Sequence, residues 1–173
     1  MSVMSTRRVR RGALGYALLE ALLAVVVTAI GFIGAARMQT FAMALNGSGQ
    51  TRQKATLLAY QMADRVRANP LGVADPPLKV NRYDNPVAGP VACLADAAGC
   101  TPAELAAADY AEWRDEVSSQ LKGGTGVICL DSTPDDGTSD ADAKCDGLGT
   151  TLAVKLWWED TVGKASLVTV IRP

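Results

Sequence analysis

The hydrophobic pattern of the chain begins with one long apolar run that is almost free of charge. Between Gly12 and Ala36 the only charged side chain is Glu20, and residues 21–36 carry a single polar side chain, Thr28. A helix of about 20 apolar residues spans the hydrocarbon core of a bilayer. The pattern therefore predicts a transmembrane helix over about residues 16–36.

Beyond this run the pattern becomes amphipathic and stays helical. Apolar side chains recur along one face of the predicted helix, at Ala55, Leu58, Met62 and Val66. Pro70 disfavours helical geometry in the residue before it, so one helix is predicted over residues 16–69. Such a helix is roughly 80 Å long, which exceeds the thickness of a bilayer, so its second half must pack on a folded region.

The remaining chain predicts an irregular connection over residues 70–100 and a globular α+β region over residues 101–173. Thr101 and Glu104 form a capping box at the start of a helix. Its apolar stripe consists of Ala106, Tyr110, Trp113, Val117 and Leu121. Short strands are predicted over residues 126–130, 151–158 and 167–171, with Gly163 and Lys164 in a turn. We expect an α+β fold in which the long N-terminal helix packs on a small antiparallel sheet with an extra helix.

Charge is distributed unevenly, although the whole chain has a formal net charge of only -1. Four arginines and no acid lie within residues 1–15, ahead of the apolar run, which predicts a cytoplasmic N-terminus and an exported remainder. The acidic residues concentrate after residue 83, and a strongly basic nucleic-acid binder is not indicated. A cleaved secretory signal is the alternative, because residues 42–44 offer a small-residue site, but the apolar run is longer than such signals usually have.

Candidate chemistry is sparse, since the chain has no histidine. This excludes nucleophiles paired with histidine and metal sites that contain it. The acidic residues Glu112, Asp115 and Glu116 share one helix face, with Asp109 nearby, but no nucleophile motif accompanies them. We expect that face to be solvated, and we expect no enzyme, no cofactor and no metal.

The four cysteines lie in the region predicted to be exported. Their spacing lacks the close pairs of a zinc ribbon, and an even count in an oxidising compartment indicates two disulfides. Three connectivities are possible, and neighbours in sequence favour Cys93–Cys100 and Cys129–Cys145. Residues 131–146 hold several aspartates, which leaves two interpretations open: a solvated loop or a Ca²⁺ site.

The segment from Gly15 to Glu20, GYALLE behind a short basic leader, resembles the N-terminus of a type IV prepilin with a class III leader. The resemblance implies that a prepilin peptidase removes residues 1–15 by cutting after Gly15, and that Tyr16 is then N-methylated. Glu20 falls at the family's glutamate position. A carboxylate in lipid needs a cationic partner, and the new α-ammonium of a neighbouring subunit could supply it and set the register between subunits.

Residues 56–70, with the run MADRVRANP, are similar to minor pilins of the PilV family, the type IV pilus modification proteins. This implies a pilin-like fold, a single-pass inner-membrane precursor with a periplasmic globular part, and a final place in the pilus at the cell surface. The implied partners are the prepilin peptidase and other minor and major pilins, and the implied roles are pilus assembly, adhesion and twitching motility. One alternative is an I-type minor pseudopilin of a type II secretion system, and another is a tip adhesin that uses Trp157.

Overall fold

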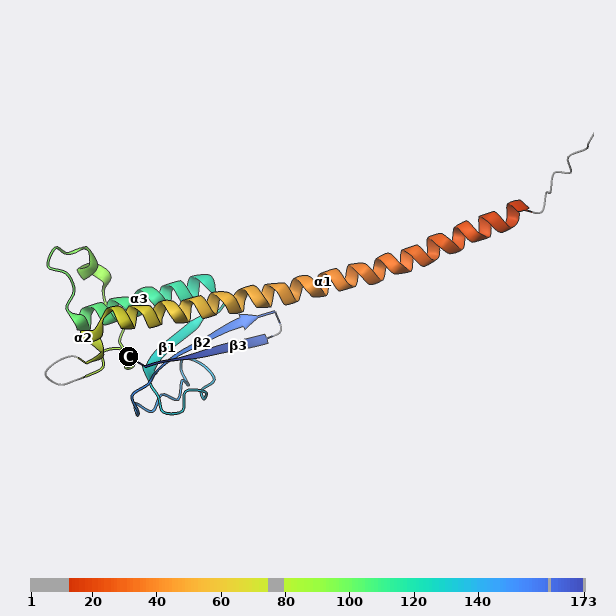
Figure 1. The fold of residues 1–173 in the computed structure, drawn as a ribbon. Helices are drawn as coiled ribbons and strands as arrows, with labels where there is room; N and C mark the ends of the chain where they lie inside the picture. The colour runs from red at the N-terminus through yellow and green to blue at the C-terminus, as the bar shows by residue number, and fades with distance from the viewer. Residues whose placement is uncertain (1–12, 75–79, 162, 173) are drawn as a thin grey trace, which may run out of the picture. The chain divides into compact units, whose positions relative to one another are not determined.

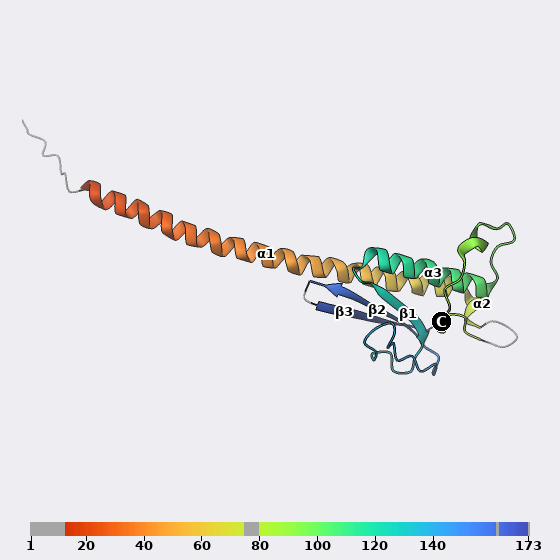
Figure 2. The same cartoon turned by 180° about the vertical axis from the view of Figure 1, so that it is seen from behind.

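The computed structural model of the chain describes residues 13–74, 80–161 and 163–172 (Figures 1 and 2). Residues 1–12, which hold most of the predicted leader, lie outside the described residues. In chain order the elements are α1 (Ala13–Ala68), α2 (Pro70–Val73), the short 3-10 helix η1 (Val91–Ala95), α3 (Pro102–Gln120), β1 (Thr125–Leu130), β2 (Leu152–Asp160) and β3 (Gly163–Ile171). The chain divides into two compact units, residues 1–45 and 46–173, and we call the second unit the head.

The first unit contains the N-terminal part of α1, whose described side chains all lie at the surface. From Tyr16 to Leu45 every residue is exposed, including the whole apolar run. The helix from Tyr16 contains a stretch that is long and apolar enough to cross a membrane, with a mean hydropathy of 2.3.

Within the head, α1 continues as helix through the glycine-containing residues 46–49 and buries its predicted apolar stripe. Ala55, Leu58, Met62 and Val66 are each at most 1% exposed. The helix ends at Ala68 because Asn69 leaves helical geometry and caps α2, whose first residue is proline.

The sheet of the head has the order β1-β2-β3, and both pairs of neighbouring strands are antiparallel. Figures 1 and 2 show α3 and the second half of α1 on one side of the sheet, and the long loop between β1 and β2 on the other. Alternate β2 residues enter the core between the sheet and the helices: Leu152, Val154, Leu156 and Trp158. The capping box at Thr101 and the apolar stripe of α3 are present as predicted.

The predicted α+β fold, a long N-terminal helix packed on a small antiparallel sheet with an extra helix, is confirmed. The predicted turn at Gly163 and Lys164 is wrong, because Gly163 pairs with Asp160 and begins β3. The hairpin is tighter than expected, and Gly163 adopts a φ of 132°, which only glycine tolerates easily.

Candidate assembly helix and polar contacts of the head

The residues predicted to act in processing and assembly lie at the beginning of α1. Gly15 and Tyr16 are helical, and Glu20 follows Tyr16 by four residues, about one helical turn. The Tyr16 side chain is 81% exposed, and Glu20 is exposed and has no hydrogen-bond or ion-pair partner among the described residues. The Thr28 hydroxyl instead donates to the Ala24 carbonyl of its own helix at 2.8 Å. Glu20 is therefore the charged group of the apolar run, and the described residues supply no partner for it.

One charge cluster of the head joins α1 to α3 through Arg65. Its guanidinium donates to Asp109 at 3.3 Å, to Glu112 at 2.8 Å and to Glu116 at 3.2 Å. These three carboxylates follow one another at helical spacing along α3, so they present one acidic row to the neighbouring helix. The expectation of a solvated acidic face is wrong for the buried Asp109. Glu112 and Glu116 remain partly exposed although they pair with Arg65, and Asp115 is exposed.

The pKa of Arg65 reflects two opposing effects. Partial burial alone would lower it, but the bonds to Glu112 and Asp109 outweigh burial, so the pKa lies above its ordinary value. The guanidinium therefore stays charged and neutralises part of the acidic row. Because Glu112 and Glu116 are occupied in this way, they form no pair free for acid–base chemistry.

Tyr83 extends this cluster towards the connecting segment. Its hydroxyl donates to Asp109 at 2.6 Å and accepts a hydrogen bond from the Asn69 amide at 3.1 Å, and its side chain is fully buried. The same amide donates to the Pro102 carbonyl at 2.8 Å. The end of α1, the segment around Tyr83 and the start of α3 are therefore held together by one buried polar network.

Burial and the hydrogen bond to Asp109 raise the pKa of Tyr83 well above its ordinary value of 10.0. The neutral phenol is thus favoured by folding, and its contribution to stability is complete below pH 10 and is lost as the pH rises towards the folded pKa.

We expect Tyr83→Phe to be less stable than the wild type by about 1–2 kcal/mol at neutral pH, with the difference shrinking above pH 10. Urea unfolding of the full chain in non-ionic detergent, at neutral pH and above pH 10, measures the difference in stability and its change with pH. The exposed Tyr60→Phe is the control, and a difference that stays constant with pH would contradict the role of Tyr83.

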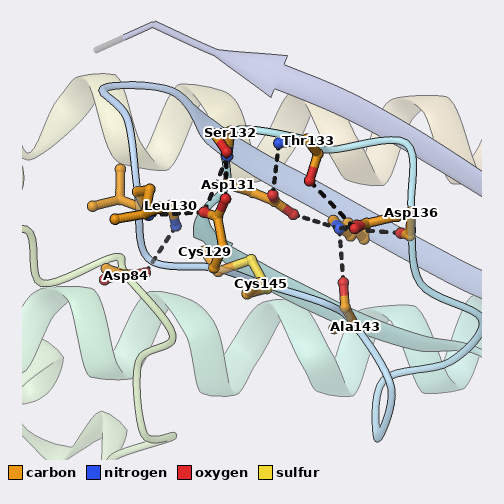
Figure 3. The surroundings of a disulfide bond; sticks show 12 residues. Asp84, Cys129, Leu130, Asp131, Ser132, Thr133, Asp136, Ala143 and Cys145 are labelled. Atoms are coloured by element: carbon orange, nitrogen blue, oxygen red, sulfur yellow. Dashed lines mark hydrogen bonds and ion pairs between the residues drawn. A yellow bond between two sulfur atoms is a disulfide. The ribbon is translucent and has the colours of Figure 1, made fainter.

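The cysteines are joined as neighbours in sequence. Cys93 is bonded to Cys100 and Cys129 to Cys145, with Cα atoms 4.9 Å and 6.1 Å apart. Figure 3 shows the second bond, which links the end of β1 to the last part of the acidic loop. The loop is therefore closed covalently at the place where it leaves the sheet.

Trp157 lies on the side of the sheet that faces the loop and is half-buried. It lines a cleft of about 220 Å³ together with Asp140, Glu159 and Lys164. The tryptophan is therefore accessible to a partner, but Glu159 also pairs with Lys122 at 3.0 Å, and nothing in this arrangement selects a particular ligand.

Part of the chain is similar to a known protein family. Residues 37–111 match the family model of the Tt1218-like proteins, described as type IV pilin Tt1218. The matched segment runs from the second part of α1 into α3, and it includes Arg65, Tyr83 and Asp109 but neither Gly15 nor Glu20. No curated protein and no solved structure matches the chain. Together with the exposed apolar helix and the α+β head, this similarity over residues 37–111 supports a type IV pilin.

Proposed function

We propose that the chain is a minor pilin of the PilV type, made as a precursor and incorporated into a type IV pilus. The observation that carries the proposal is the exposed apolar part of α1 with one carboxylate, Glu20, that has no partner among the described residues, in a chain whose residues 37–111 match a type IV pilin. An apolar helical segment whose side chains are all exposed in the described part of the chain, residues 16–45, needs a membrane before assembly and other helices after it. The protein acts by assembly, not by catalysis.

Processing follows from the order of residues at the start of α1. The prepilin peptidase cuts after Gly15 on the cytoplasmic side of the inner membrane and leaves an α-ammonium on Tyr16, which is then methylated. The basic leader stays cytoplasmic by the distribution of arginines, and the head lies in the periplasm. The disulfides of the head suit that oxidising compartment.

Sequencing the N-terminus of the mature chain, made with and without the prepilin peptidase, tests this proposal. We expect release of residues 1–15 and a methylated Tyr16 only when the peptidase is present. An intact Met1 in both preparations, or a cut near Ala44 as a secretory signal would give, contradicts it.

Glu20 is the residue on which assembly should depend most. In the membrane its carboxylate pairs with the Tyr16 α-ammonium of a neighbouring pilin, and this pair sets the axial register of the two helices. We expect Glu20→Ala to be inserted and processed normally but to be absent from sheared pili, as measured by immunoblotting of the pilus and membrane fractions.

Thr28→Ala is the matched control, because Thr28 is the other polar residue of the run and its hydroxyl bonds to its own helix. This variant should enter pili as the wild type does. Equal incorporation of Glu20→Ala and Thr28→Ala would show that the carboxylate does not set the register.

The second candidate is an I-type minor pseudopilin of a type II secretion system, which uses the same membrane chemistry. The similarity of residues 56–70 to PilV proteins favours the pilus. Deletion of the gene separates the two: loss of piliation and twitching with normal protein export supports the minor pilin, and the reverse supports the pseudopilin.

A further inference from the structure

The acidic loop after β1 covers a lysine at the centre of the sheet. Lys155 lies in the middle strand β2, between Val127 of β1 and Val168 of β3, and its side chain is 0% exposed. A fully buried lysine is rare unless it is paired with an anion. The covering loop is residues 131–146, which the disulfide between Cys129 and Cys145 closes (Figure 3).

Four oxygen atoms of the loop surround the ammonium group. Two belong to carboxylates, Asp131 Oδ2 at 2.6 Å and Asp136 Oδ1 at 3.0 Å from Nζ. Two are backbone carbonyls, those of Asp136 at 3.1 Å and Ala143 at 2.7 Å. Figure 3 shows these groups of Asp131, Asp136 and Ala143 directed towards a common point. Carboxylates and backbone carbonyls are also the ligands that a hard divalent cation such as Ca²⁺ takes in proteins.

We infer that the Lys155 ammonium is the resident cation of this loop and occupies the position that a divalent metal ion would otherwise fill. The native head thus closes its acidic loop without calcium. The aspartates of residues 131–146 left two interpretations open, a solvated loop or a metal site. The inference replaces both with a loop that is closed around a lysine of the sheet. The inference does not depend on the proposed function.

The buried carboxylate of Asp131 requires such a cation. Its side chain is 0% exposed, and an isolated ionised carboxylate in that environment would be strongly destabilising. Burial alone would lower the pKa of Lys155, but Asp131 and Asp136 outweigh it and raise the pKa, so the amine stays protonated. The sulfur atoms of Cys129 and Cys145 lie close to Asp131. They are joined in a disulfide, so they offer no thiolate to a metal.

A covalently attached cation has one property that a bound ion lacks: it does not dissociate. The conformation of the loop is therefore independent of the concentration of calcium and of chelators. The loop also contributes Thr138, Ser139 and Asp140 to the cleft beside Trp157, so Lys155 positions one wall of that surface. A partner that binds there meets the same loop conformation at any calcium concentration.

Thermal unfolding of the full chain in non-ionic detergent tests the inference. All three tryptophans lie in the head, so their fluorescence reports its unfolding. We expect the Tm of the wild type to be the same in millimolar calcium and in a chelator. Lys155→Ala should have a lower Tm than the wild type in chelator. Calcium should raise the Tm of this variant by about 5 °C, because the four oxygen atoms that held the ammonium then bind the ion. A wild-type Tm that rises with calcium, or a variant that calcium does not stabilise, overturns the inference.

Lys144→Ala is the matched control, because Lys144 belongs to the same loop but pairs with Asp142 at the surface. Its Tm should follow the wild type in both conditions.

Amine labelling of the wild type gives an answer even if Lys155→Ala does not fold. With an acylating reagent and mass spectrometry, Lys155 should stay unmodified while Lys122, whose side chain is 83% exposed, reacts fully. Equal modification of the two lysines would show that the ammonium is not enclosed.

Discussion

Replacing Trp113 by alanine is expected to destabilise the head by about 4 kcal/mol. The side chain is 0% exposed and is the largest among the fully buried ones. Its indole nitrogen donates to the Leu58 carbonyl at 2.8 Å, so the ring contacts α1 as well as the sheet. Alanine would leave a large cavity where α1, α3 and β1 meet, and the surrounding elements cannot close it without moving. Urea unfolding of the full chain in detergent, followed by circular dichroism, measures the loss.

The close fit of Trp113 against β1 supplies an independent check. A Cβ atom added at Gly126 would lie 2.4 Å from the Trp113 ring, so Gly126→Ala should also destabilise the head. Trp157→Ala is the matched control, since it removes the same side chain from a half-exposed position. If Trp157→Ala destabilised the head as much as Trp113→Ala, the ring of Trp113 would not be the contact that joins the three elements.

The parts of the fold that could be predicted are those in which the residue pattern of one helix or strand shows which of its sides faces the core. The stripe from Ala106 to Leu121 repeats at helical spacing because one side of α3 faces the core. Leu152, Val154 and Leu156 recur at every second position because one face of β2 also faces the core. Such patterns depend only on the residues of the element itself, so a single sequence contains them.

The polar contacts of Arg65 and Lys155 could not be predicted, because each depends on residues far away in the chain. Arg65 and Asp109 are separated by 44 residues, and neither segment shows that the other will lie opposite. Lys155 lies on the face of β2 that is opposite the core helices, and the loop that covers this face has no periodic pattern. Its burial therefore became visible only in the structure.

These contacts also change the interpretation of the acidic head. Asp109, Glu112 and Glu116 are bound by Arg65, and Asp131 and Asp136 are bound by Lys155. A substantial part of the acidity thus stabilises the head internally and is not available for catalysis or metal binding. This agrees with the proposed role in pilus assembly.

Arg65→Ala is expected to destabilise the head by about 3 kcal/mol. Removing one partner of a buried ion pair typically costs about 3–5 kcal/mol, and the lower end applies because Glu112 and Glu116 are 40% and 33% exposed. Without the guanidinium, three carboxylates of α3 repel one another, and Asp109 remains 11% exposed beside them. Urea unfolding in detergent at neutral pH measures the effect.

Arg67→Ala is the matched control, because Arg67 lies two residues later on α1 and pairs with the exposed Asp64 three residues away. Exposed pairs of this kind contribute about 0–1 kcal/mol, so this variant should remain close to the wild type. Adding Asp109→Asn to Arg65→Ala should recover part of the lost stability, since it removes the most buried of the three charges while an amide can still accept from Tyr83. Equal effects of Arg65→Ala and Arg67→Ala, or no recovery in the double variant, would mean that the acidic row of α3 does not need its cation and that apolar packing alone joins the two helices.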